Sequence, residues 1–203
     1  MAKIPRKQAK RPTEEKPKQL WVLTGGNGAG KTTFYNHFIR PTGIPLVNAD
    51  SLAKALYPDD PESHSYISAR LIDDLRHRLL IEKYNFCFET VFSHPSKIDF
   101  IADAKARGYE TVLVYIHVEH PQLNAMRVAQ RVSEGGHNVP AEKIFSRIPR
   151  VIENVRRALP LCDVVRFYDN SSSDNPFVPV RTLRNRQIED HLSPSPEWVR
   201  FFE

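Results

Sequence analysis

Four residues near the N-terminus have the types and the spacing that bind a phosphate group. Gly25, Gly30, Lys31 and Thr32 fill the fixed positions of the pattern G-x-x-x-x-G-K-[ST]. The glycines allow successive backbone N–H groups to turn inward around an anion, the lysine reaches the β- and γ-phosphates, and the threonine hydroxyl binds Mg²⁺. We therefore predict binding of ATP or GTP with Mg²⁺ by Gly25, Gly26, Asn27, Gly28, Ala29, Gly30, Lys31, Thr32 and Thr33.

This pattern needs a strand before it and a helix after it. Residues 20–23 form a short apolar run suited to a buried strand, and the chain from Lys31 onward has helical composition. The alternative is a glycine-rich turn that binds nothing. The adjacent Lys-Thr pair and the two flanking elements favour the phosphate-binding interpretation.

The rest of the chain alternates short apolar runs with longer helical stretches, which is typical of a parallel sheet covered by helices on both faces. We predict an α/β fold: a P-loop kinase-type three-layer sandwich with a mostly parallel sheet, a helical lid and a small C-terminal hairpin. The expected strands are 20–23, 44–50, 85–92, 110–118 and 163–169, with the hairpin in 177–191. The expected helices are 62–83, 95–107, one starting at Pro121, and one from about Pro140 that Pro149 must kink or split.

The basic charge is concentrated at the N-terminus. The chain has 203 residues and a net charge of +5, and residues 1–18 carry seven Lys or Arg against two Glu, so the remainder is neutral overall. We predict a disordered basic tail over 1–18 and a single domain over 19–203. The tail could touch RNA, a membrane or a partner, but its composition favours a solvated leader. The neutral remainder of the chain offers no basic groove for a nucleic-acid strand, which argues against nucleic acid as the partner.

The sequence has no apolar stretch that resembles a secretory signal or a membrane span. Cys87 and Cys162 lie in apolar, strand-like surroundings without the spacing of a metal site. Buried reduced thiols are typical of a cytoplasmic protein. We therefore predict a cytoplasmic location and no membrane partner.

Three carboxylates stand at the ends of expected strands, where open α/β sheets bind their ligands, and one of them, Glu119, is expected to lie on the surface. Asp50 is the candidate base that takes the proton of an acceptor hydroxyl; the alternative is that it caps a helix starting at Ser51. Glu89 is the candidate for a Mg²⁺ ligand, directly or through water, or for an acceptor contact. Thr90 and Ser93 are expected to bind the acceptor beside it.

Phosphoryl transfer also needs cations for the charge on the transferred oxygens. Arg127 and Arg131 precede the pair Gly135–Gly136, and Arg147 and Arg150 follow Pro140. The glycine pair is suited to a hinge, which favours a mobile lid carrying arginines. The alternative is that these arginines lie on the solvated faces of two helices.

The chain resembles the zeta-toxin-like family of P-loop kinases, especially its short single-domain members. The resemblance runs from about Leu20 to Asn170 and is carried by GGNGAGKT, VNAD, FETVFS, RVSEGGHNVP with RIPR after it, and YDNS. The P-loop alone is shared by many families, and its combination with VNAD and GGHNVP is far more specific.

The resemblance implies phosphorylation of a small-molecule hydroxyl by ATP or GTP; for zeta toxins the acceptor is UDP-N-acetylglucosamine. It implies Asp50 as the acceptor-activating aspartate, Lys31 and Thr32 as phosphate and Mg²⁺ contacts, and a nucleotide base near YDNS. It further implies Arg131 and Arg147 as lid arginines, Arg150 as a further basic contact, and an antitoxin as a possible partner. A nucleic-acid end kinase, a nucleoside kinase and a nucleotide-dependent switch without phosphotransfer remain alternatives.

Overall fold

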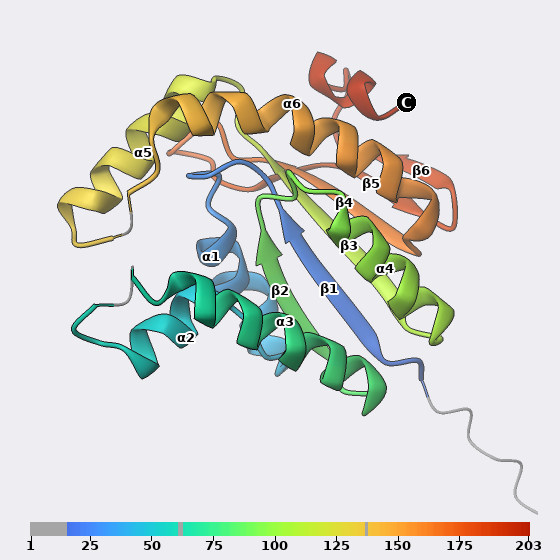
Figure 1. Ribbon diagram of the computed structural model, residues 1–203. Coiled ribbons are helices and arrows are strands. Elements are labelled where there is room, and N and C mark those ends of the chain that lie inside the picture. The colour runs from blue at the N-terminus through green and yellow to red at the C-terminus, as the bar shows by residue number, and fades with distance from the viewer. Residues whose placement is uncertain (1–15, 61–62, 137) are drawn as a thin grey trace, which may run out of the picture.

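The computed structural model describes residues 16–60, 63–136 and 138–203 (Figure 1). Most of the predicted basic tail, residues 1–15, lies outside them. The strands are β1 Gln19–Thr24, β2 Phe86–Thr90, β3 Glu110–His117, β4 Val164–Asp169, β5 Val178–Arg184 and β6 Gln187–Asp190. The α-helices are α1 Lys31–Phe34, α2 Ala49–Leu56, α3 Ser65–Ile81, α4 Ser96–Ala106, α5 Pro121–Ser133 and α6 Ala141–Ala158. The shorter helical segments are η1 Tyr35–Ile39, η2 Arg40–Thr42, η3 Leu159–Leu161 and η4 Glu197–Phe202.

The six strands form one mixed sheet in the order β2-β1-β3-β4-β5-β6. The pairs β1–β2, β1–β3 and β3–β4 are parallel, whereas β4–β5 and β5–β6 are antiparallel. The predicted parallel sheet and C-terminal hairpin are thereby confirmed. Because β1 has parallel neighbours on both sides, the loop that follows it lies at the carboxyl end of the sheet, where α/β folds bind ligands.

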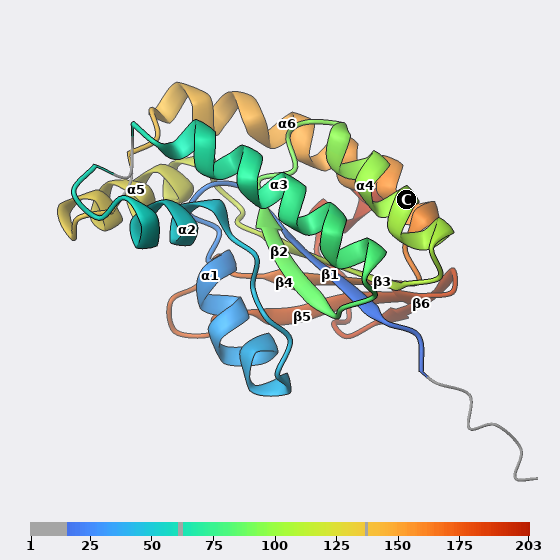
Figure 2. The same ribbon diagram turned by 60° about the horizontal axis from the view of Figure 1, so that its bottom comes forward.

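Helices cover both faces of the sheet, which gives the predicted three layers (Figures 1 and 2). On one face, Leu20 and Val22 of β1 belong to an apolar cluster with side chains of α3, α4, α6 and η4. On the other face, Leu23 packs with Phe34 of α1 and with η1. Alternate residues of β1 are therefore buried on opposite sides, which fixes the strand and the loop that follows it.

The segment 44–50 is not the strand that we predicted. It makes one parallel bridge to the sheet, between Leu46 and Cys87, and α2 already begins at Ala49. Asn48 caps this helix: its side chain accepts hydrogen bonds from the N–H groups of Asp50 and Ser51. The cap ends the extended segment after one bridge, and Asp50 lies inside the first turn, so the alternative of Asp50 as the cap is wrong.

The expectation that Pro149 splits its helix is also wrong. α6 is one continuous helix over Ala141–Ala158 with Pro149 inside it. Ile144 on one side of the proline and Val151 and Val155 on the other are buried. Packing of this apolar face against the sheet holds both halves together, although proline removes one backbone hydrogen bond.

Among the described residues, no helix has the length and apolar character needed to cross a membrane.

Candidate active site

The phosphate-binding loop joins β1 to α1, and its shape depends on glycine. Gly30 has φ 91°, and a Cβ atom there would come within 2.6 Å of Nδ2 of Asn170. A side chain at this position would therefore meet both backbone strain and a steric clash. The loop thus brings its backbone, Lys31 and Thr32 to one cavity, as the motif predicts.

Three side chains that the motif does not contain hold the loop in place. Asn124 of α5 donates from Nδ2 to the carbonyl of Asn27 (2.7 Å), and Asn170 donates from Nδ2 to the carbonyl of Ala29 (2.9 Å). Arg147 of α6 donates from Nη1 to Oδ1 of Asn27 (3.2 Å). Both asparagines are buried, so these bonds tie the loop to the core.

The Lys31 ammonium group folds back onto its own loop. Its Nζ donates to the carbonyls of Gly25 (3.0 Å) and Gly26 (2.9 Å). Burial lowers the pKa of Lys31 to about 8, and the nearby Glu89 acts in the opposite direction. Arg131 and Arg147 lower this pKa further and Asp50 raises it, so Lys31 lies in a field of both cations and carboxylates.

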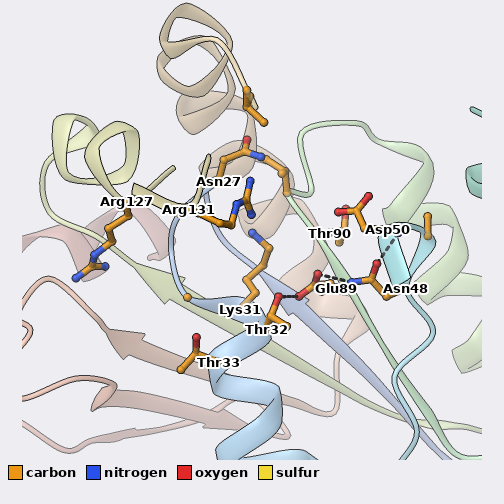
Figure 3. Close-up of a pocket in the computed structure, with 15 residues that line it drawn as sticks. Asn27, Lys31, Thr32, Thr33, Asn48, Asp50, Glu89, Thr90, Arg127 and Arg131 are labelled. Atoms are coloured by element: carbon orange, nitrogen blue, oxygen red, sulfur yellow. Dashed lines mark hydrogen bonds between the residues drawn. The ribbon is translucent and has the colours of Figure 1, made fainter. Parts of the chain in front are cut away.

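Thr32 and Glu89 form the candidate metal site. Thr32 Oγ1 donates to Glu89 Oε2 (2.9 Å), and Asn48 Nδ2 donates to Glu89 Oε1 (Figure 3). Hydroxyl and carboxylate oxygens suit Mg²⁺, which usually takes one or two protein ligands and completes its shell with water and phosphate oxygens. The chemistry of the Thr32 hydroxyl and the Glu89 carboxylate therefore fits the predicted ion.

A cavity of about 420 Å³ lies over the loop and receives side chains from α1, α2, β2 and α5 and from the loops beside them. Figure 3 shows Asp50 and Thr90 on one side, Arg131 with Asn27 on the other, and Lys31 and Glu89 between them. Among the described residues, its walls are Asn27, Gly28, Gly30, Lys31, Thr32, Thr33, Asn48, Ala49, Asp50, Glu89, Thr90, Val91, Arg127, Arg131 and Val139. The cavity thus combines a phosphate-binding loop, cations and a carboxylate on an exposed helix turn.

Some predicted site residues lie elsewhere. Ser93 and Arg150 are not among the described residues that line this cavity. Arg150 donates from Nε to the carbonyl of Ser146 in its own helix. Arg147 contacts the loop through Asn27 and is not among the described residues that line the cavity, whereas Arg127, which we expected only as part of the lid, lines it.

A second cavity of about 220 Å³ adjoins the loop at Gly28 and Gly30. Arg127 lines both cavities and donates from Nη1 to the carbonyl of Asn170 (2.8 Å). The other walls include Ser172, Pro176 and Phe177. Residues 170–177 follow β4, as expected for YDNS, and give this smaller cavity an aromatic wall and polar groups.

The comparison with known families agrees with this geometry. A model of the zeta toxin family matches residues 2–176, which is most of the chain. The chain belongs to the zeta toxin family. It is a P-loop kinase by family and by fold, as the sequence predicts.

Individual relatives are distant in sequence. An uncharacterized protein of Haemophilus influenzae is 28% identical over 137 residues, which cover 64% of this chain and 97% of that protein. The crystal structure of AvrRxo1-ORF1:-ORF2 with ATP matches with a TM-score of 0.72 at 19% identity, over 92% of this chain and 64% of that chain. The chain therefore spans slightly less than two thirds of this structural relative.

A third relative is the PezAT chromosomal toxin-antitoxin system of Streptococcus pneumoniae. It matches with a TM-score of 0.64 at 21% identity, over 79% of this chain and 72% of that chain. At such identities these two structures show the fold alone.

Proposed function

We propose that the protein transfers the γ-phosphoryl group of ATP or GTP to a hydroxyl of a small acceptor. The observation that carries the proposal is that Lys31 and Asp50 line the same cavity, on either side of Glu89 (Figure 3). A switch that only binds nucleotide needs the loop but no carboxylate facing the γ-phosphate. An acceptor hydroxyl, in contrast, needs a group that takes its proton.

Each residue has a separate role in the proposed reaction. Asp50 accepts the proton while the acceptor oxygen forms its bond to the γ-phosphorus, and the bond from that phosphorus to the β,γ-bridging oxygen breaks. Lys31 and Arg131 stabilise the negative charge that spreads over the transferred oxygens. The products are a phosphorylated acceptor and ADP or GDP.

Thr32 and Glu89 would hold Mg²⁺, which, when bound, neutralises charge on the β- and γ-phosphates. The smaller cavity beside Gly28 and Gly30 is where we place the nucleotide base, with Phe177 as its aromatic wall. The AvrRxo1 structure with ATP supports nucleotide use by this fold. Neither point selects ATP over GTP.

We propose a UDP-N-acetylglucosamine-like nucleotide sugar as the acceptor, with Asp50, Glu89 and Thr90 as its contacts. Membership of the zeta toxin family supports this choice. PezAT is a toxin-antitoxin system, which supports an antitoxin partner for this chain too. Growth arrest on expression of the wild type, and normal growth with Lys31→Ala at equal protein level, would support a toxic kinase.

Release of ADP or GDP in the presence of candidate acceptors tests the proposal. We expect turnover to rise well above basal hydrolysis with UDP-N-acetylglucosamine or a related nucleotide sugar, and mass spectrometry to find one added phosphate. Stimulation by oligonucleotides or nucleosides alone would instead favour the corresponding kinase. Nucleotide binding with no stimulation across all three classes would favour a switch and refute phosphotransfer.

A further inference from the structure

Asn48 uses both ends of its side-chain amide. Oδ1 accepts hydrogen bonds from the backbone N–H groups of Asp50 (2.7 Å) and Ser51 (3.2 Å), which caps α2. Nδ2 donates to Glu89 Oε1, and the second carboxylate oxygen of Glu89 accepts from Thr32 Oγ1. One amide therefore joins the helix turn that carries Asp50 to the carboxylate beside the P-loop (Figure 3).

The orientation of this amide follows from chemistry. A flipped amide would turn its NH₂ group toward two backbone donors and its oxygen toward a carboxylate, which leaves every contact mismatched. Aspartate, serine and threonine also cap helices, but an aspartate would face Glu89 with a like charge. The short serine and threonine hydroxyls can accept the hydrogen bonds of the cap, but these side chains have no NH₂ group that reaches Glu89. Among good capping residues, asparagine alone also presents a donor to Glu89.

We infer that Asn48 is a positioning residue that orients the metal-side carboxylate of Glu89 and, independently, holds the acceptor-side turn of Asp50. This inference rests on the proposed function, in which Glu89 and Thr32 hold Mg²⁺. Partners that hydrogen-bond a ligating carboxylate orient it, and their loss typically weakens metal binding by about 10–100-fold. The Oδ1 and Nδ2 atoms of Asn48 thus have separate roles, in the helix cap and in the orientation of Glu89, and substitutions can separate them.

Asn48→Ser retains a cap and removes the donor to Glu89, whereas Asn48→Ala removes both contacts. Asn48→Thr repeats the first test with another capping hydroxyl, in case the serine variant folds poorly. Ser51→Ala is the matched control, because it alters the same exposed helix turn outside the described walls of the cavity. The full chain is used throughout, with a fluorescent ATP analogue and Mg²⁺ as the probes.

We expect the serine variant to need about 10–100-fold more Mg²⁺ for tight binding of the analogue, with unchanged affinity in the absence of metal. Its melting temperature and its kcat at saturating Mg²⁺ should stay near those of the wild type. The alanine variant should show the same Mg²⁺ shift, a lower melting temperature, and a lower kcat even at saturating Mg²⁺, because Asp50 is no longer held.

A wild-type Mg²⁺ requirement in both capped variants would overturn the role of Asn48 and leave the proposed function standing. Binding of the analogue that is insensitive to Mg²⁺ in the wild type would refute Thr32 and Glu89 as metal ligands, and the inference with them. Equal Mg²⁺ shifts in Ser51→Ala would mean that the helix turn, and not the amide, controls the site.

Discussion

The two sides of the cavity are attached to the molecule in different ways. On the nucleotide side, buried Asn124 and Asn170 hold the loop from α5 and from the end of β4. On the acceptor side, α2 buries only Ala53, and the segment before it meets the sheet through one bridge at Leu46. The nucleotide side is thus held by buried side chains of two elements, whereas the acceptor side lies on a short helix that packs against α3 and whose first turn is capped by Asn48.

This difference has a functional consequence. A loop fixed by buried side chains keeps the triphosphate geometry that P-loop kinases share, while a helix turn outside the sheet can differ between acceptors. We therefore expect substitutions on the two sides to have different signatures. Substitutions on the nucleotide side should lower turnover by the same factor for every acceptor. Substitutions on the acceptor side should lower turnover while nucleotide affinity stays unchanged.

The largest effect is expected for Lys31→Ala. Loss of this cation should lower kcat by about 10²–10³-fold, the usual size for removal of one electrostatic donor at a transition state. The fold should persist, because the charge of Lys31 is disfavoured by burial. Steady-state kinetics and thermal melts check both points, with Lys54→Ala on the exposed surface of α2 as a control. Near-normal turnover would refute the assignment of the loop.

Arg131→Ala should lower kcat by about 10–10²-fold with a smaller loss of nucleotide affinity, because its charge is needed most in the transition state. Arg147→Ala should instead weaken nucleotide binding, since Arg147 contacts Asn27 of the loop. Arg157, exposed on the same helix, supplies the control Arg157→Ala. Equal kcat and affinity losses in both variants would show that the two arginines do not have separate roles.

Asn170→Ala tests whether the nucleotide side is part of the core. It leaves the carbonyl of Ala29 without its buried donor and should cost about 1–3 kcal/mol of unfolding free energy. Denaturant titration measures this loss, and nucleotide affinity should fall with it. A variant as stable as the wild type would show that this contact contributes little to the loop.

The pKa of Lys31 predicts how nucleotide binding depends on pH. Phosphate groups bind the charged form of the Lys31 amine. When the pH exceeds the Lys31 pKa of about 8, nucleotide binding must therefore take up a proton. The affinity for nucleotide should then fall by up to about tenfold per pH unit. Unbound protein should respond oppositely: the lowered folded-state pKa makes stability rise between about pH 8 and 10.5. Calorimetry at pH 7 and 9 checks the first effect, and Lys31→Arg should flatten it.

Sequence patterns predicted the parts of the site that depend on local chemistry. The glycine-rich loop, the buried strand before it and the hairpin after β4 follow from residue types and short-range periodicity. Sequence patterns did not predict the side chains that hold the loop. Asn124 and Asn170 are single polar residues whose hydrogen-bond partners lie 97 and 141 positions away in the chain. Asn124 lies in a segment with no recognised pattern, and Asn170, although it belongs to YDNS, shows no local sign of its hydrogen bond to Ala29.

Two further errors have local causes. The apolar pattern of 44–50 favoured a strand, and Asn48 ended it by capping a helix one residue later. The capping signal was present in the Asn-Ala-Asp-Ser order, where Asn48 and Asp50 were both suitable caps. Pro149 was expected to kink or split its helix, and the expected split is wrong because the local rule ignores tertiary packing, which here keeps α6 continuous.

Acceptor-dependent turnover of Asp50→Asn is the most direct test of phosphotransfer by this cavity. Because Asn48 supplies the cap, this substitution keeps the shape of the turn and removes only the ability to accept a proton. We predict that kcat with the best acceptor falls by about 10²-fold or more, with melting temperature and ATP affinity little changed. Turnover close to that of the wild type would contradict the account and leave Glu89 as the next carboxylate to test.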